Sequence, residues 1–303
     1  LLNSQPMGFY APAQLVRDAR DHGVEVRPPD VGLSDWDCTL EAEPASANGV
    51  ALRLGLCQIK GFKEVDAARL VAARDAGYAD ARALWRRAGL SAAALDKLAQ
   101  ADAFGTLGLA RRDALWTVKG LGEAPLPLFA AAEARLGTGV GGPEPAAHLP
   151  IMGLGEEVIE DYNSLRLSLK SHPLALLREV LSKRGVVTAE RLAKIKQGRR
   201  ISVCGLVLVR QRPGTAKGVI FATLEDETGV ANVIVWPPIF ERYRRIVLGA
   251  RLLQVDGEVQ REGIVIHIIA KHLIDQTPLF ARLAEPAAIA GKQPIPVVSR
   301  NFH

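Results

Sequence analysis

The sequence predicts a multidomain α+β chain in which a helical region is followed by a small β-barrel. Two observations predict this order. Residues 55–118 and 157–198 have the helical hydrophobic period, and from Ile201 the period changes to two, which is typical of strands. Residues 119–156, rich in Pro, Gly and Ala, are predicted to link the helical segments. A chain of 303 residues is long enough for two or three domains, each with a core.

The composition narrows the class of protein. The formal net charge of +5 favours an anionic partner such as a nucleic acid without requiring one. No apolar run approaches the ~18 residues of a membrane span, so we expect no membrane partner. The cysteines Cys38, Cys57 and Cys204 lie far apart in the sequence and form no C-x-x-C pair. Their spacing argues against a zinc site or a disulfide scaffold and predicts a reducing, cytoplasmic location.

Residues 1–54 are predicted to combine one helix with extended chain. In APAQLVRDARDHGVEV, Leu15, Val16 and Ala19 share one helical face, and Gly23 ends the pattern where a left-handed cap residue is expected. The following VRPPDVGLSDWDC contains adjacent prolines, which force an extended backbone, so we expect no helix there.

Four short helices joined by glycine turns are predicted next. Their expected ranges are 64–75, 80–88, 91–101 and 110–118. The last two, in LSAAALDKLAQADAFGTLGLARRDALW, fit either a degenerate second copy of the hairpin described below or plain core packing.

The segment IKGFKEVDAARLVAAR, residues 59–74, has the pattern of a helix–hairpin–helix motif. In such a motif the hairpin glycine lets backbone amides approach a DNA phosphate without reading the base sequence. Lys63 stands where a second glycine is usual and adds a cation. The candidate DNA-binding residues are Lys60, Gly61, Lys63 and Arg69. An ordinary alanine-rich helical hairpin can produce the same pattern.

Five β-rich runs make up the barrel region: ISVCGLVLVRQR, GVIFATLED, GVANVIVW, ARLLQVDGEVQ and GIVIHIIAKHL. A short amphipathic helix, PPIFERYRRIVLG, lies between the third and the fourth run. This order is that of a five-stranded OB-fold barrel, expected over residues 199–276. The proline-broken tail, residues 277–303, is expected on the surface.

The segment RPGTAKGVIFATLEDETG, residues 212–229, begins like a phosphate-binding loop. A P-loop requires a helix after G-K-[ST], whereas a strand follows here and neither Ser nor Thr follows Lys217. We therefore interpret it as the connection between the first two barrel strands, which OB folds use to bind oligonucleotides. Arg210, Arg212 and Lys217 are either cations for a phosphate backbone or solvated loop charges. Gly229 is expected to give the turn EDETG its positive φ.

Alternation along the second and third strands separates inward-facing from outward-facing residues. The inward set is aliphatic: Ile220, Ala222, Leu224, Ala231, Val233 and Val235. The outward set is Val219, Phe221, Thr223, Asn232, Ile234 and Trp236. Phe221 and Trp236 are candidates for stacking on the bases of a single strand. The alternative is that they pack against a neighbouring domain or against Phe240 and Tyr243 of the following helix.

No catalytic residue or metal site is predicted in the chain. The sequence contains no G-x-S-x-G, no H-E-x-x-H and no pair of carboxylates in a recognisable metal-binding run. If the chain belongs to an enzyme, we expect it to supply binding rather than chemistry.

Several blocks, in order, resemble the C-terminal part of bacterial C-family (DnaE-type) DNA polymerases. They are LGLCQIKGFKEVDAARLVAAR, LDKLAQADAFGTLGLARRDAL, LPLF, LSLKSHPL and GLVLVRQRPGTAKGVIFATLEDETG, and the resemblance covers essentially the whole chain. The opening QPMGFYAPAQLVRDARDHGVEVRPPDV, the DWDC block and the ending SRNFH are most similar to the error-prone, damage-inducible branch (ImuC). The start without methionine is expected of a piece of a longer protein.

The resemblance implies both a division of the chain and an activity. The implied parts are the end of the fingers region (1–54), a helix–hairpin–helix module on the exiting duplex (55–118), a linker (119–156), a helical connector (157–198) and an OB domain near single-stranded template (199–276). The implied activity is error-prone DNA-directed DNA synthesis past lesions. Its Mg²⁺ ions and palm carboxylates are expected upstream of Leu1, with no cofactor in this chain.

The resemblance also implies how partners are recruited. Replicative relatives carry a sliding-clamp peptide, Gln-x-x-Leu/Met-Phe, where this sequence reads PLPLF. Leu128 and Phe129 could still fill an apolar pocket, but Pro125 replaces the anchoring glutamine. We therefore expect indirect clamp recruitment through accessory translesion proteins. The alternatives are a fragment of a replicative alpha subunit and a non-catalytic DNA-binding repair accessory protein.

Overall fold

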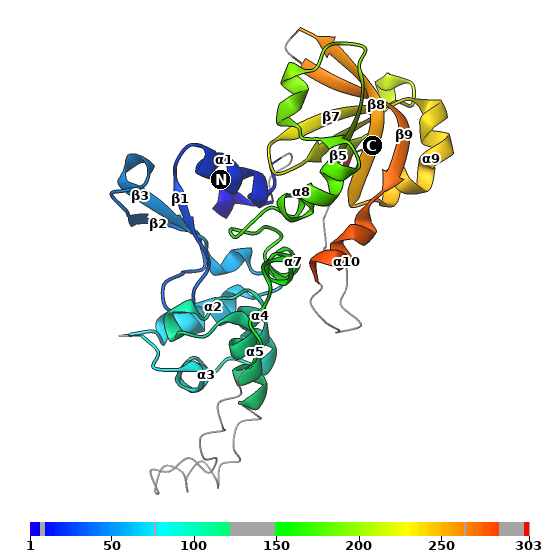
Figure 1. Cartoon of the computed structure of the whole chain (residues 1–303). Helices are drawn as coiled ribbons and strands as arrows, with labels where there is room; N and C mark the ends of the chain where they lie inside the picture. The colour runs from blue at the N-terminus through cyan, green and yellow to red at the C-terminus, as the bar shows by residue number, and fades with distance from the viewer. Residues whose placement is uncertain (7–9, 76, 122–148, 264, 285–299, 303) are drawn as a thin grey trace, which may run out of the picture. The chain divides into compact units, whose positions relative to one another are not determined.

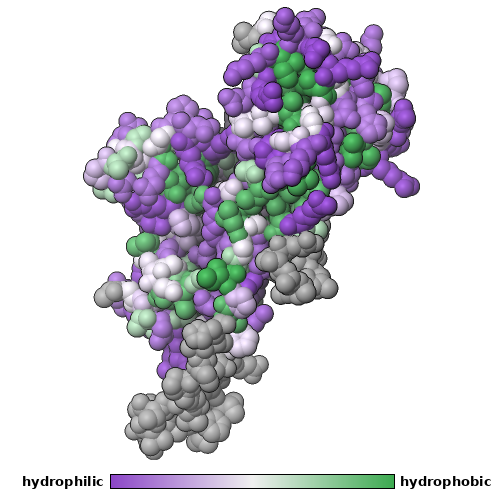
Figure 2. All heavy atoms as spheres, viewed as in Figure 1, coloured by the Kyte–Doolittle hydropathy of each residue, from purple (hydrophilic) through white to green (hydrophobic). Residues whose placement is uncertain are grey.

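The computed structural model describes residues 1–6, 10–75, 77–121, 149–263, 265–284 and 300–302 (Figure 1). The chain forms two compact units. The first comprises Leu1–Met152 with Ser164–Leu169, and the second comprises Gly153–Asn163 with Lys170–His303. Hydrophilic residues cover most of the surface that Figure 2 shows, with hydrophobic patches between them, as expected when each unit buries its own core.

The first unit begins with a helix and a small sheet. After η1 (Leu2–Ser4), helix α1 (Pro12–Asp21) ends before Gly23, whose φ is +80°, as predicted. The strands are β1 (Glu25–Arg27), β2 (Thr39–Ala42) and β3 (Val50–Arg53), with η2 (Ala47–Gly49) before the last. β3 lies between its partners, parallel to β1 and antiparallel to β2. The adjacent prolines after β1 lie in irregular chain, so no helix forms there, as expected.

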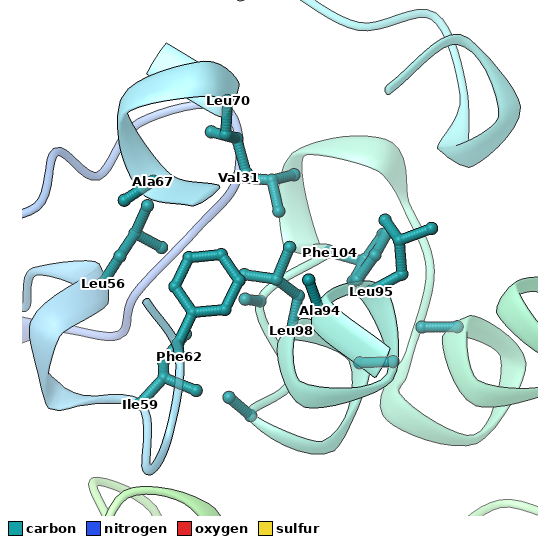
Figure 3. Close-up of a cluster of buried hydrophobic side chains, with 14 of the residues drawn as sticks. Val31, Leu56, Ile59, Phe62, Ala67, Leu70, Ala94, Leu95, Leu98 and Phe104 are labelled. Carbon is teal, nitrogen blue, oxygen red and sulfur yellow. The ribbon is translucent and has the colours of Figure 1, made fainter. Parts of the chain in front are cut away.

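The four predicted helices are present in the same unit. They are α2 (Glu64–Ala72), α3 (Ala81–Ala88), α4 (Ala92–Gln100) and α5 (Arg111–Gly120), with η3 (Leu56–Gln58) before α2 and η4 (Gly105–Leu107) before α5. Figure 3 shows side chains from η3, α2 and α4 converging on one core. Leu56, Phe62, Leu70, Leu98 and Phe104 are buried in it. Because each helix turns one apolar face to this core, the helical period was visible in the sequence.

The second unit contains the predicted five-stranded barrel. Its strands are β5 (Arg200–Gln211), β6 (Ile220–Glu225), β7 (Val230–Val235), β8 (Leu252–Glu262) and β9 (Val265–Asp275), and α9 (Pro237–Gly249) follows β7. Strands pair in the order β5–β6–β7–β9–β8, and β8 pairs with β5 to close the barrel. The β7–β9 pairing is parallel and the other four are antiparallel. This topology is that of an OB fold.

The alternation predicted for β6 and β7 holds with one exception. All six aliphatic residues of the inward set are buried in the barrel core. Phe221 is half-buried, and Trp236 is exposed. Val219, predicted to face outward, is buried. It precedes the first residue of β6, so strand alternation does not decide where its side chain points.

Three helices pack against the outer side of β5 and β8. They are α7 (Leu154–Ser164), α8 (Pro173–Lys183) and α10 (Phe280–Leu283), and α10 follows η7 (Thr277–Leu279). Leu174 and Phe280 share a buried cluster with Leu206 and Leu252 of the barrel. The prediction that the tail lies on the surface is therefore wrong at its start. Pro278 sits in the first turn of η7, where a proline is tolerated, and the apolar residues after it reach the cluster.

The remaining short elements join or flank β5. β4 (Val186–Val187) and β10 (Arg300–Phe302) both pair with β5 in parallel. The 3₁₀ turn η5 (Glu190–Lys194) lies between β4 and β5, and η6 (Gly214–Ala216) lies between β5 and β6.

The turn between β6 and β7 is closed by a carboxylate. Asp226 Oδ1 accepts hydrogen bonds from the backbone N–H of Thr228 at 2.8 Å and of Gly229 at 3.0 Å. Gly229 does not have a positive φ, so that expectation is wrong. The Asp226 side chain, rather than the conformational freedom of glycine, shapes this turn.

Candidate nucleic-acid interface

The first hairpin turn connects η3 to α2 and is anchored by the core of its unit. Ile59 and Phe62 are buried, and Phe62 N donates to Ile59 O at 3.1 Å. Gly61, between them, has a φ of +70°, which favours glycine. The hairpin therefore forms where the sequence placed it, and its backbone requires the glycine.

The outer side of this hairpin carries positive charge. Lys60, Gly61, Lys63 and Arg69 are all exposed. Lys63 is the N-cap of α2 and makes no side-chain capping bond, so a capping side chain does not occupy the first N–H groups of the helix. Two acidic residues in the first turn of α2 lower the local positive potential. The arrangement can bind an anion through amides and ammonium groups together.

A further cation reaches the hairpin from α4. The Lys97 ammonium donates a hydrogen bond to the carbonyl oxygen of Gly61. This bond ties the hairpin to α4 and adds a positive charge beside it. Sequence reasoning missed Lys97 because the two residues are 36 positions apart and no local pattern connects them.

The loop between α4 and α5 is held from inside by a buried carboxylate. Thr106 donates to Asp30 through its backbone N–H at 2.9 Å and through its hydroxyl at 2.6 Å, and Gly32 N donates to the same carboxylate at 2.7 Å. A phosphate would have to displace this carboxylate to reach the Thr106 amide. The carboxylate of Asp30 therefore closes the Thr106 side of this loop to a phosphate.

The structure places Arg210 away from the surface of the β5–β6 loop, contrary to the prediction. A β-bulge between Val207 and Val209 shifts the alternation of β5, so that Arg210 pairs with the inward-facing Ala222. Arg210 is 6% exposed, and its guanidinium donates to the carbonyl oxygen of Ala250. Burial lowers the pKa of Arg210 to about 10. We therefore regard Arg210 as a structural residue.

Arg212 and Lys217 do lie at the surface of this loop. The guanidinium carbon of Arg212 lies 5.2 Å from the centroid of the Phe240 ring, in the first turns of α9. Lys217 has a left-handed φ of +48°. A Cβ on Gly218 would lie 3.4 Å from Arg212 Nη2 and 3.7 Å from Pro237 Cγ, so the loop packs against the start of α9.

The two candidate stacking residues differ in exposure. Trp236 is 50% exposed and forms the N-cap of α9, directly beside the loop. Phe221 is half-buried and lies opposite Ile234 of β7 on the outer side of the sheet. Trp236 therefore offers more open ring surface to a base than Phe221 does.

Helix α9 adds cations that sequence reasoning missed. Arg242, Arg244 and Arg245 are exposed. The guanidinium carbon of Arg244 lies 5.9 Å from the Phe240 ring centroid, so Arg244 and Arg212 lie over the same ring. The run ERYRR displays these charges in the sequence, but only the fold brings them beside the loop. The loop–helix surface consists of Arg212, Lys217, Trp236 and Arg244.

Neither a metal cluster nor a membrane span is found in the part of the chain that the structure describes. No three His, Cys, Asp or Glu side chains there are grouped so as to hold a metal ion. No helix within the described ranges is long and apolar enough to cross a bilayer. Leu128 and Phe129, the predicted partner-binding residues, lie outside the described residues.

Two family models match the regions that contain the two candidate surfaces. Residues 23–114 match a helix-hairpin-helix motif, and residues 201–275 match an OB-fold nucleic acid binding domain. Both matches agree with the folds observed, and they confirm the predicted order of a helical hairpin region followed by an OB barrel.

Curated relatives match nearly the whole chain. The "Error-prone DNA polymerase" of Ruegeria pomeroyi is 57% identical over 98% of this chain, and that of Allorhizobium ampelinum is 53% identical over 94%. The chain is homologous to error-prone DNA polymerases. "Error-prone DNA polymerase 2" of Rhizobium meliloti is 51% identical over 94% of the chain. The chain spans 26% of the length of each of these three error-prone DNA polymerases, and the resemblance inferred from its sequence blocks is confirmed.

Proposed function

We propose that this chain is the DNA-binding part of an error-prone DNA-directed DNA polymerase, which acts in translesion synthesis and damage-induced mutagenesis in the bacterial cytoplasm. The observation that carries the proposal is the 57% identity, over 98% of the chain, with a protein of that name. The two domain types support it, because hairpin motifs and OB folds are both suited to binding nucleic acids without sequence preference.

The hairpin of the first unit suits the backbone of duplex DNA. The N–H groups at the start of α2 and the ammonium groups of Lys60 and Lys63 can bind phosphate oxygens, and such contacts read no base edge. Arg69 extends the positive surface along α2. Sequence-independent contact is what an enzyme that copies any template requires.

The loop–helix surface of the second unit suits single-stranded template. Arg212, Lys217 and Arg244 supply charge for the phosphates. Trp236, with Phe221 as a second platform, supplies stacking worth ~1–3 kcal/mol per base. Arg210 is left out of this surface because its guanidinium is buried and bonded to the chain's own backbone.

The polymerase chemistry would come from the rest of the full-length protein. Nucleotidyl transfer uses Mg²⁺ held by carboxylates, and the described residues contain no group suited to hold it. We therefore assign no catalytic residue and derive no catalytic step. The proposed partners besides DNA are accessory translesion proteins, with the sliding clamp reached indirectly, because Pro125 stands where a clamp peptide has glutamine.

The test separates the two surfaces by the DNA that each binds. Replacing Lys60 and Lys63 by Ala should weaken duplex binding about tenfold and leave single-strand binding near the wild-type level, since the removed charges contact duplex phosphates. Replacing Arg212 and Lys217 by Ala should weaken single-strand binding and leave duplex binding near the wild-type level. Fluorescence anisotropy with a labelled hairpin duplex and a labelled oligothymidine measures both.

Two exposed lysines outside both surfaces provide a matched control. Replacing Lys119 of the first unit and Lys183 of the second by Ala in one protein removes two positive charges, as each double variant does, and should change neither affinity by more than about twofold. If both double variants bound each DNA as the wild type does, the proposal would be wrong. If each double variant weakened both DNAs equally, the division of roles would be wrong.

A further inference from the structure

Cys38 and Cys57, which are distant in the sequence, come together in the first unit. Cys38 immediately precedes β2, and Cys57 lies in η3, just before the hairpin turn. The two side chains interact, and each thiol shifts the pKa of the other. Both side chains are partly exposed, and neither is in a disulfide.

The backbone holds the two cysteine-bearing segments close together. Leu56 N donates to Asp35 O at 2.9 Å, and Cys57 N donates to Trp36 O at 3.0 Å. Gly55 lies so close to the other segment that a Cβ on it would be 2.4 Å from Trp36 O. Residue 55 must therefore be glycine, and the thiols meet because the backbones do.

The surroundings of the two sulfur atoms differ. The Cys57 thiol, and then the backbone N–H of Gly55 (3.3 Å from Cys38 Sγ), stabilise the Cys38 thiolate and lower the pKa of Cys38 to about 7. The pKa of Cys57 is raised, first by its interaction with the Cys38 side chain and then by partial burial. At neutral pH Cys38 is thus the more nucleophilic of the pair.

Space for a small reagent lies beside Cys38. This residue lines an open pocket of about 340 Å³, together with apolar residues that include Leu15 and Leu52. A small oxidant fits this space easily. Cys204 is not expected to react, because it is 3% exposed and burial raises its pKa to about 12.

We propose that Cys38 and Cys57 form an oxidisable dithiol, which a hydroperoxide converts into an intramolecular disulfide. In the first step the Cys38 thiolate attacks the peroxide, an S–O bond forms, the O–O bond breaks, and the alcohol or water leaves with a proton. In the second step the Cys57 sulfur attacks the Cys38 sulfenic acid. An S–S bond forms, the S–O bond breaks, and water carries away the hydroxyl group and the Cys57 proton.

Peptide mapping of the 303-residue chain tests the proposal. The reduced protein is treated with hydrogen peroxide at neutral pH, remaining thiols are alkylated, and the chain is digested with trypsin without reduction. Trypsin separates the three cysteines into peptides 21–53, 54–60 and 201–210. We expect peptides 21–53 and 54–60 to be joined with the loss of two hydrogens, and peptide 201–210 to carry the alkyl group. Two alkylated thiols in the first two peptides would overturn the proposal.

Variants and pH separate the roles of the two sulfurs. Cys57→Ser should leave a Cys38 sulfenic acid that dimedone traps, whereas Cys38→Ser should leave Cys57 alkylatable. The oxidation rate should rise about tenfold from pH 6 to pH 8 and then level, following a thiolate with a pKa of about 7. Equal oxidation of Cys57 in Cys38→Ser would contradict this order of attack. A joined peptide that formed as fast in guanidinium chloride would show that the folded pairing plays no part.

Discussion

At the scale of single residues, one carboxylate ties the small sheet of the first unit together. Glu41 Oε1 accepts from Arg53 Nε at 2.7 Å, and its Oε2 accepts from Arg53 Nη2 at 3.0 Å and Arg27 Nη1 at 2.7 Å. These residues come from three different strands, β1, β2 and β3. The Arg53 guanidinium, followed by that of Arg27, lowers the pKa of Glu41.

Glu41→Gln should therefore destabilise this unit by about 1–3 kcal/mol at pH 7. A carboxyl whose pKa is lowered on folding contributes stability above its unfolded pKa of about 4.3, and this contribution is lost as the pH falls through the lower folded value. The difference between wild type and Glu41→Gln should thus shrink below about pH 4. Hydrogen exchange of the β3 amides at pH 7, 5 and 3.5 measures it.

The matched control for that experiment is Glu25→Gln. Glu25 bonds to Arg27 at 2.7 Å, but its side chain is more exposed than that of Glu41, so the change should cost under about 1 kcal/mol. Equal losses for the two variants would contradict the account of Glu41 as the central group.

Residue-level placement was the least predictable part of the candidate site. Arg210 and Arg212 are two positions apart, yet Arg210 is turned inward after a β-bulge, whereas Arg212 lies beyond the end of β5 and stays at the surface. A bulge depends on how two strands pair, which charge patterns do not reveal. Lys97 was missed for a similar reason, because only the packing of α4 brings it to Gly61. By contrast, Gly61 was predictable, since its role depends on local backbone conformation.

At the scale of elements, the turn between β6 and β7 fastens the barrel to the chain that precedes it. The Asp226 carboxylate is buried and accepts from Ala189 N at 2.7 Å in addition to its bonds within the turn. Arg178 of α8 forms ion pairs with Asp226 and Glu227. One side chain thus shapes the turn and joins it to two other segments.

Asp226→Ala should leave three partly buried N–H groups without their acceptor and should destabilise the second unit by about 3 kcal/mol. Hydrogen exchange of the β6 and β7 amides measures this unit separately from the other. Glu179→Gln, a change at a highly exposed carboxylate on α8, serves as the control and should have almost no effect. Unchanged protection of β6 and β7 in Asp226→Ala would show that the turn does not depend on this carboxylate.

The elements themselves were largely predictable. The helices of residues 55–118 and the barrel strands repeat their hydrophobic residues with the periods of helix and strand, because each buries one face. The buried residues of η7 and α10 were not predicted, since prolines masked the pattern and their contacts are with distant segments. The turn between β6 and β7 was predicted, but its shape was attributed to Gly229 rather than to Asp226, because glycine and aspartate both favour turns.

At the scale of the whole molecule, the two units have separate hydrophobic cores and carry separate candidate surfaces. Variants in one surface should therefore leave the fold of the other unit intact, which is what makes the division of roles testable. The order of sequence blocks predicted a relationship to error-prone DNA polymerases, and the relatives confirm it over 94–98% of the chain. The hydrophobic periods and the fold class alone did not identify this relationship, because hairpins and barrels serve many functions.

The salt dependence of DNA binding tests most directly whether the cations of this chain contact the phosphate backbone. Association constants for a hairpin duplex and for an oligothymidine are measured from about 50 to 200 mM salt, and log K is plotted against log salt concentration. We predict a negative slope for both DNAs. Replacing Lys60 and Lys63 by Ala should reduce the duplex slope by about 2, and replacing Arg212 and Lys217 should reduce the single-strand slope by somewhat less. An affinity that did not change with salt, or slopes that stayed the same in both variants, would contradict the account.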